Sequence, residues 1–247
     1  MKKFFALMFS SVALLSFFQS CDNPENEYVI DSSRDNIFTV REITGSRVVV
    51  SPEFQDTIYW LSNAGKYGFE VGYRARMILR EYFDSNTMKY PECTVEKIVE
   101  TLPVYPLTPA DAIDASEYTT PVSGFKLYFN WGYDELPIWV WDNIQNINIK
   151  YKGDNPSFAM TVMGVDGDCI ELQLLIKADK GTGEEKTKLL SFDLNGLGSI
   201  LTENEKSSLA SYETLKTVVY FKKLDVDGSL NNAPTEECEF DNPFRSK

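Results

Sequence analysis

Short stretches in which apolar and polar residues alternate fill the first half of the chain and predict β-strands. A long stretch near Gly72 has room for a bend, because glycine tolerates conformations that other residues avoid. About five short strands within residues 37–106 suit a small barrel such as an OB-fold. The predicted strands of this block are Phe38–Ile43, Arg47–Val50, Thr57–Leu61, Gly68–Phe83 and Cys93–Val99.

The stretches between residues 122 and 228 are longer and predict a β-sandwich, because regular strands and turns alternate there with little helix. Asp166-Gly167-Asp168 separates two apolar runs and predicts a tight hairpin. Thr202 followed three residues later by Glu205 fits a capping box, which predicts a short helix through Leu209. The fold class expected from the whole pattern is all-β, an OB-like barrel followed by a sandwich.

The two strand-rich blocks are separated by a stretch of different composition. Prolines recur between residues 102 and 121, so residues 107–121 are interpreted as a linker in which a short helix can start near Pro109. Residues 229–247 are polar and are interpreted as a loose tail. The chain is therefore expected to hold two separable β domains.

The first 20 residues have the pattern of a secretory signal peptide. Lys2 and Lys3 precede an apolar run over residues 4–18, and Ser20 supplies a small residue before a cut. Cys21 follows directly, at the position that lipoprotein processing requires. Diacylglycerol and N-acyl chains on this cysteine would exceed the two-signal threshold for stable membrane anchoring. Cys21 is therefore the predicted lipidation site, with an ordinary cleaved signal as the alternative.

Residues 21–36 are interpreted as an acidic tether, because Asp22, Pro24 and Glu25 begin a polar stretch without apolar periodicity. This stretch resembles the acidic address that gut-type Gram-negative anaerobes place after the lipid cysteine to send lipoproteins to the surface. The resemblance implies an outer-membrane lipoprotein exposed at the cell surface. The other interpretation is a plain solvated linker.

The anchor, the tether and the two β blocks together resemble the NigD-like lipoproteins of gut anaerobes. Local matches are Ile144–Tyr151 and Leu190–Leu197, and the resemblance covers nearly the whole chain after the leader. It implies an N-terminal OB-like domain and a C-terminal sandwich. The family takes its name from a protein proposed to give immunity to a bacteriocin, and it offers no catalytic residue to carry over.

Composition excludes several functions. The chain has no histidine, which removes Ser-His-Asp and Cys-His catalysis and histidine-based zinc sites. Its net charge of −13 repels phosphate backbones, so nucleic acid is not an expected partner. Cys93, Cys169 and Cys238 lie far apart without metal-ligand spacing and are interpreted as small core or edge residues. No cofactor and no metal site are expected.

Tryptophans supply the candidate ligand contacts. Trp139 and Trp141 are two residues apart and share one face of a strand, and Trp131 is near them in sequence. Exposed, this set would stack on sugar rings. However, Ile138 and Val140 make the other face of the strand apolar too, and such strands are usually interior. A core role is favoured for these tryptophans over a glycan platform.

Two charged patterns have ordinary interpretations. Arg74, Arg76 and Arg80 are spaced along one predicted strand and are expected to form a solvated face paired with glutamates such as Glu70 and Glu81. Residues 225–236 carry oxygen ligands at some calcium-loop spacings. Leu230 stands where such a loop needs glycine and Pro234 spoils the following helix, so a turn is expected there.

These observations favour a non-enzymatic, lipid-anchored binding module that contacts an unknown protein or glycan, with bacteriocin immunity among its possible roles. The alternatives are a structural or accessory subunit of a surface assembly and a glycan-binding lipoprotein. A carboxylate-based hydrolase ranks last, because no pair of acidic residues stands out as a catalytic pair. The membrane is reached through the lipid on Cys21.

Overall fold

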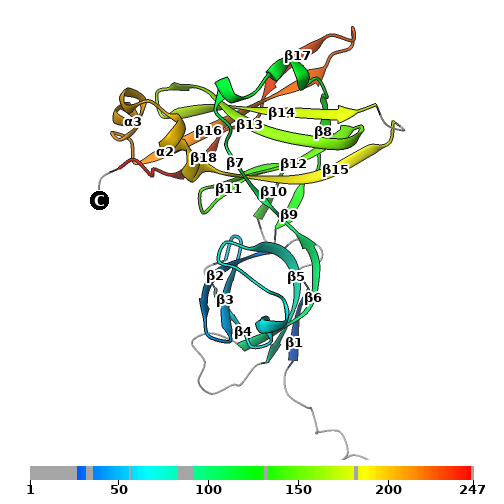
Figure 1. The fold of residues 1–247 in the computed structure, drawn as a ribbon, viewed down its shortest axis with the longest axis vertical. Coiled ribbons are helices and arrows are strands. Elements are labelled where there is room, and N and C mark those ends of the chain that lie inside the picture. Colours follow the sequence, from blue (N-terminus) through cyan, green and yellow to red (C-terminus); the bar gives the residue numbers. More distant parts are fainter. Residues whose placement is uncertain are drawn as a thin grey trace, which may run out of the picture.

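The computed structural model of the chain describes residues 27–31, 36–55, 57–82, 92–130, 133–180 and 183–245. These residues form an all-β structure with a small closed barrel and a separate pair of packed sheets, as the sequence predicts (Figure 1). Cys21, the leader and Trp131 lie outside the described residues.

Six strands build the barrel, in the order β1-β5-β2-β3-β4-β6, and a further pairing of β5 with β6 closes it. The β4–β6 pairing is parallel and the others are antiparallel. Val50, Leu61, Met77 and Leu79 are among the side chains that fill its interior. The strands are β1 Glu27–Asp31, β2 Ile37–Thr44, β3 Arg47–Pro52, β4 Tyr59–Leu61, β5 Arg74–Tyr82 and β6 Glu92–Thr101, with the 3-10 turn η1 Ala64–Lys66 between β4 and β5.

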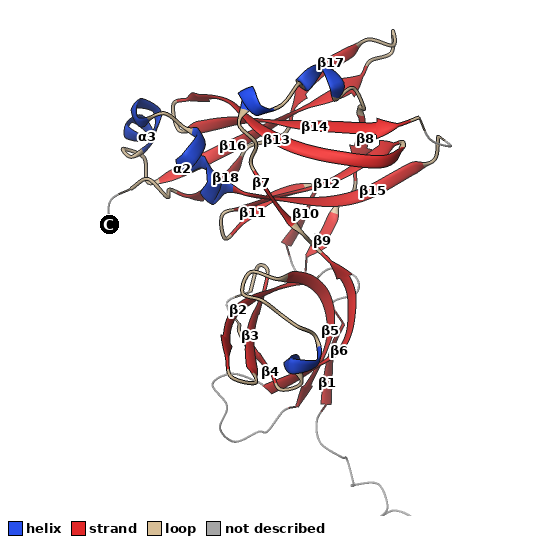
Figure 2. Cartoon of the chain, in the orientation of Figure 1, coloured by secondary structure: helices blue, strands red, loops and turns tan. Residues whose placement is uncertain are grey.

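The second part of the chain is a sandwich of two sheets. One sheet has the order β11-β12-β15-β7, and β8 also pairs with β12; the other has the order β13-β14-β16-β17, and β18 also pairs with β16. Strands β9 and β10 form a two-stranded ribbon (Figure 2). The strands are β7 Val104–Pro106, β8 Val122–Phe125, β9 Tyr128–Asn130, β10 Tyr133–Leu136, β11 Ile138–Trp141, β12 Ile144–Lys152, β13 Asp154–Asp166, β14 Cys169–Asp179, β15 Glu185–Asp193, β16 Thr214–Leu224, β17 Leu230–Pro234 and β18 Cys238–Asp241.

The sandwich core forms because alternate residues of the two sheets face each other. Ile147 and Phe192 project from one sheet, and Leu172 and Val219 from the other, and none of the four is exposed. Burying such apolar side chains is the main driving force for folding. The alternation of apolar and polar residues along these strands therefore predicts which side chains face the core.

Several local predictions are confirmed. Gly167 and Asp168 connect β13 to β14, with Gly167 at a φ of +61°. Helix α3 spans Glu203–Leu209, and its capping box is complete: Thr202 accepts a hydrogen bond from the Glu205 N–H, while the Glu205 carboxylate accepts from the Thr202 N–H. The remaining helical elements are η2 Ala110–Ala112, η3 Ala115–Glu117, η4 Leu194–Gly196 and α2 Leu197–Ile200.

Other segments differ from the sequence-based expectation. Residues 27–31 of the expected tether form β1, which pairs with β5, and residues 230–234 and 238–241 of the expected loose tail form β17 and β18 on β16. All three are short strands at a sheet edge, and backbone hydrogen bonds to a neighbouring strand help to order them. Residues 104–106, which fall in the block predicted to be the barrel, form β7 and pair in parallel with β15 of the sandwich. The division into two separable domains remains a prediction.

Gly153 lies where the chain passes from one sheet of the sandwich to the other, between β12 and β13. Its φ is +130°, and a Cβ placed there would lie 2.7 Å from both the Ala178 Cβ and the Asp179 carbonyl oxygen. A side chain has neither the backbone freedom nor the space at this corner. Glycine is therefore required for the two sheets to stack at this point.

Candidate functional site

Trp139 and Trp141 lie at the junction between the barrel and the sandwich. Trp139 is only 3% exposed and belongs to a small apolar group shared by both parts, the junction cluster. Its members are Ile37, Leu102, Trp139 and Leu189, with Phe54, Leu136 and Trp141 packed against them. Trp139 therefore cannot stack on a sugar, and the core interpretation holds for it, whereas Trp141 is half-buried.

A buried polar network crosses the same junction. The guanidinium of Arg74 on β5 forms an ion pair with the carboxylate of Glu53, which follows β3, and neither side chain is more than 1% exposed. From the sandwich side, Trp139 Nε1 donates to Glu53 Oε2 over 3.1 Å. Arg74 Nη2 donates to the side-chain oxygen of Asn146 over 3.1 Å, and the Ser191 hydroxyl donates to the same oxygen over 2.8 Å.

This environment changes the chemistry of Glu53 and Arg74. Burial raises the pKa of the Glu53 carboxyl, against the opposing effect of Arg74 and of its hydrogen bonds. Among the described residues, Nε and Nη1 of Arg74 have no hydrogen-bond partner. Buried ion pairs often give little net stability, because desolvation opposes the attraction. The network therefore supplies directional contacts between the barrel and the sandwich.

The three arginines of β5 do not form the solvated face predicted for them with Glu70 and Glu81. Arg74 is buried against Glu53, while Arg76 lies 3.6 Å from Glu100 and Arg80 lies 3.4 Å from Glu96. The prediction was wrong about the partners because β5 pairs with β6, which carries the two latter glutamates. Strand pairing between distant segments is not visible in the local sequence.

A second, more exposed contact joins the barrel to the sandwich. Arg41 on β2 forms an ion pair with Asp142, and Arg41 Nε donates to the Ser51 hydroxyl over 2.6 Å. Asp142 and Asn143 make the tight turn between β11 and β12, both with positive φ (51° and 57°). Asp and Asn tolerate this conformation better than other residues with side chains, and two such residues in a row are typical of a hairpin turn.

The turn is held firmly in place. The Asn143 carbonyl accepts a hydrogen bond of 2.8 Å from the Leu194 N–H, and the Asn143 amide donates to the Asn195 side-chain oxygen over 3.3 Å. Leu194 and Asn195 belong to the 3-10 turn η4 after β15. The carboxylate that Arg41 meets is therefore positioned by the sandwich.

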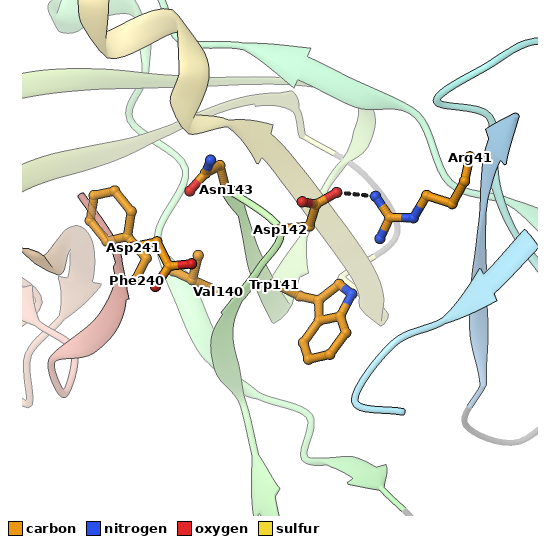
Figure 3. Close-up of a pocket in the computed structure, with 7 residues that line it drawn as sticks. All are labelled: Arg41, Val140, Trp141, Asp142, Asn143, Phe240 and Asp241. Atoms are coloured by element: carbon orange, nitrogen blue, oxygen red, sulfur yellow. Dashed lines mark hydrogen bonds and ion pairs between the residues drawn. The ribbon is translucent and has the colours of Figure 1, made fainter. Parts of the chain in front are cut away.

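A cavity of about 380 Å³ opens beside this ion pair and is called here the junction cavity. Figure 3 shows Arg41 reaching from the barrel toward Asp142, with Trp141 below and Phe240 and Asp241 on the far side. The lining residues are Arg41, Val140, Trp141, Asp142, Asn143, Phe240 and Asp241. Trp141 Nε1 is buried and has no hydrogen-bond partner among the described residues.

A smaller cavity of about 310 Å³ is lined by the same ion-paired residues, Arg41 and Asp142. Val71 and Gly72 of the barrel and Asp193 of the sandwich also line it. Cavities of roughly 300–1,000 Å³ accommodate small ligands or single side chains of a partner. The geometry therefore provides two recesses that share Arg41 and Asp142.

The described residues do not supply a metal site or a reactive thiol. They contain no group of three or more acidic or cysteine side chains that could hold a metal ion. Burial raises the pKa of Cys93 to about 12 and that of Cys238 to about 11, and it also raises the pKa of Cys169. These thiols stay protonated at neutral pH and are poor nucleophiles. The residues around the junction cavity are suited to hydrogen bonding and aromatic contact.

Sequence reasoning found Trp139 and Trp141 but missed Arg41, Glu53, Asp142 and Asn146. The Asp142-Asn143 pair between two apolar strands is a hairpin signal that would have located the turn.

The segment of residues 225–231 forms a turn, as predicted. The Asp227 carboxylate accepts a hydrogen bond of 2.9 Å from the Ser229 N–H, and Gly228 has a φ of +84°. No helix in the described part of the chain is both long enough and apolar enough to span a membrane.

Several solved structures have a fold similar to that of this chain. A toxin-related protein of Parabacteroides distasonis is similar with a TM-score of 0.55 and 15% identity, over 89% of this chain and 96% of that one. A protein of Bacteroides fragilis described as a lipoprotein gives a TM-score of 0.58 and 12% identity, over 88% and 99%.

A NigD-like immunity protein of Bacteroides caccae has a TM-score of 0.50 and 13% identity, over 80% of this chain and 90% of that one. The resemblance to the NigD-like lipoproteins is thus confirmed at the level of the fold. No family model matches the chain, and no curated protein matches its sequence.

Proposed function

We propose that the chain is a non-enzymatic, lipid-anchored envelope lipoprotein that binds a partner through the junction cavity. The main support is the Arg41–Asp142 ion pair, which connects the barrel to the sandwich and lines two recesses at once. Binding sites commonly lie at the meeting of two structural units, where side chains from both converge. A ligand at this position would contact both parts of the molecule.

The anchor is the lipidated Cys21 of the proposed mature chain. The apolar leader and the cysteine directly after it support this assignment, as does the structural similarity to a protein described as a lipoprotein. The acidic tether supports delivery to the outer face of the outer membrane. A Cys21→Ser variant is expected to lose labelling by radioactive palmitate, and undiminished labelling would contradict the anchor.

The barrel is assigned to the OB class. Its strand order from β2 onward, with an antiparallel β2-β3-β4 meander, a parallel β4–β6 pairing and closure through β5, supports this assignment. OB barrels and sandwiches are frequent scaffolds for binding. The assignment is a statement about topology, and the ligand must be argued from the site.

The preferred ligand class is a protein. Two structural neighbours support this preference by their descriptions, one as an immunity protein and one as toxin-related. A chain of net charge −13 attracts partners with positive surfaces and accelerates their association. A bacteriocin-immunity role belongs to this class of function.

A glycan is the second candidate. The half-buried Trp141 provides aromatic surface in the junction cavity, and Asn143 and Asp241 provide hydrogen-bonding groups beside it. Sugars are recognised by this mixture of ring faces and polar side chains, because each sugar ring has an apolar face and hydroxyl edges.

Photo-crosslinking in living cells, together with a glycan array, distinguishes a protein ligand from a glycan ligand and from the absence of any ligand. A crosslinking amino acid at Asn143 is expected to capture a discrete protein, whereas the same group at exposed Lys97 on the barrel should not. A glycan-array signal lost in Trp141→Ala and Asp241→Ala would favour the glycan. Equal capture at both positions, with no array signal, would contradict the junction site. Polysaccharide turnover abolished by a single Asp or Glu substitution would contradict the non-enzymatic assignment.

A further inference from the structure

Another cavity, of about 490 Å³, lies at the opposite end of β12 from the junction cavity. Asn143 of the junction cavity precedes β12, and Lys152 of this cavity ends it. Its lining residues come from β8 of one sheet and from the end of β16 of the other, two strands that lie against each other at this end of the sandwich. We call it the mouth cavity.

The floor of the mouth cavity is apolar. Val122 and Phe221 are 4% and 6% exposed, and the Phe125 and Phe221 rings meet edge-to-face with centroids 5.1 Å apart. Leu224 also lines the cavity and is 55% exposed. An exposed large apolar side chain beside an apolar recess favours an apolar ligand, because covering both removes hydrocarbon surface from water.

The rim of the mouth cavity is basic. Lys152 and Lys223 both line it, and no ion pair of either lysine is found among the described residues. Glu185, which lies opposite Lys152 in the strand pairing, accepts a hydrogen bond of 2.9 Å from Ser123 and lies 3.4 Å from Lys150. The pKa of Glu185 is lowered mainly by the Ser123 hydrogen bond and in smaller part by the attraction of Lys152, but no ion pair within 4.0 Å is found for Lys152 or Lys223 in the described part of the chain. Two ammonium groups without an ion pair at one apolar recess are unexpected in a chain with 37 acidic and 24 basic residues.

We propose that the mouth cavity binds a medium-chain aliphatic carboxylate. The alkyl chain lies on Val122, Phe125 and Phe221, and the carboxylate lies between the ammonium groups of Lys152 and Lys223. The volume falls within the range of roughly 300–1,000 Å³ typical of small-molecule sites, and the lining combines apolar walls with a few charged groups. A sugar fits this floor less well than an alkyl chain, because the side chains of Val122, Phe125 and Phe221 offer no partner for its hydroxyl groups.

Titration calorimetry with decanoate, below its micellar concentration, tests the site on the mature protein with Cys21→Ser. Decanoate is expected to bind with one site per chain. Decanol, which has the same chain length without the charge, should bind at least about 5-fold more weakly, and decyltrimethylammonium should bind more weakly still. Absence of binding by decanoate, or equal affinity for decanoate and decanol, overturns the proposal.

Variants locate the binding. Lys152→Met with Lys223→Met keeps the aliphatic stems and should weaken decanoate by about 5-fold or more while leaving decanol unchanged. Leu224→Asp changes an exposed position and should weaken both ligands. Lys97→Met, on the barrel, is the matched control and should change neither. Unchanged decanoate affinity in the double lysine variant overturns the assignment to this cavity. The result is independent of the junction site, because the two cavities share no residue.

Discussion

The indole nitrogen of Trp139 donates a hydrogen bond of 3.1 Å to Oε2 of Glu53, and this bond joins a sandwich strand to the barrel. On its other side Glu53 is paired with Arg74, which also donates to Asn146 of the sandwich. The position of the barrel relative to the sandwich is thus constrained by hydrogen bonds, which are directional and tolerate little rotation.

Replacing Arg74 with Met is expected to destabilise the protein by about 3–5 kcal/mol, because it leaves the buried carboxyl of Glu53 without its cation. The double variant Arg74→Met with Glu53→Leu should recover most of this loss, since both desolvated groups are then absent. Urea unfolding at neutral pH measures both changes.

The matched control for Arg74 is Arg80→Met on the same strand, whose side chain is 38% exposed and lies 3.4 Å from Glu96. It should cost less than about 1 kcal/mol, as exposed pairs do. Equal losses in Arg74→Met and Arg80→Met would show that burial of the first pair is not what matters.

Trp139→Ala is expected to cost about 3–5 kcal/mol, because it removes a large buried ring from the junction cluster. Trp139→Phe keeps most of the ring volume but removes the N–H bond to Glu53, so it should cost about 1–3 kcal/mol. Thermal melts of the two variants check the order. A fully stable Trp139→Ala protein would mean that the ring is not structural.

Gly153→Ala should be among the most destabilising single methyl additions in the chain. The positive φ of +130° alone is expected to cost the folded state about 1–3 kcal/mol. The 2.7 Å approach of the added carbon to Ala178 and Asp179 adds to that loss. Gly228→Ala is the control, because Gly228 also has a positive φ (+84°) but no atom within 4 Å of the added carbon. If both variants melt alike, steric crowding at the sheet corner has no effect.

Cys93 should contribute to a loss of stability in alkali. Its side chain is fully buried, and burial raises its pKa from 9.0 to about 12, so the folded state holds the proton more tightly than the unfolded chain. The contribution is fully present below pH 9 and is lost as the pH rises toward about 12. Cys93→Ala is therefore expected to be less stable at pH 7 but to lose less stability between pH 8 and pH 10.5.

Denaturant unfolding at the two pH values measures this difference between the parent protein and Cys93→Ala. Cys169→Ala is the comparison, because this residue is only partly buried. In the folded protein, Cys93 should also resist a thiol reagent at pH 8 that labels Cys169. Rapid labelling of Cys93 without unfolding would contradict its burial.

The sequence by itself determined the class of fold and the local elements. Period-2 alternation located most strands, Gly167 located a hairpin, and Thr202 with Glu205 located a capped helix, because each signal depends on residues close together in the chain. Apolar residues on both faces of the strand around Trp139 also indicated that this tryptophan is buried.

Only the tertiary structure decided which strands meet, and the junction depends on that. Glu53, Arg74 and Asn146 are separated by long stretches of chain, and no local pattern relates them. The same holds for Arg41 and Asp142, which are 101 residues apart. Short edge strands such as β17 and β18 were also missed in the sequence, because backbone pairing with β16 orders them and Phe240 is their only buried side chain.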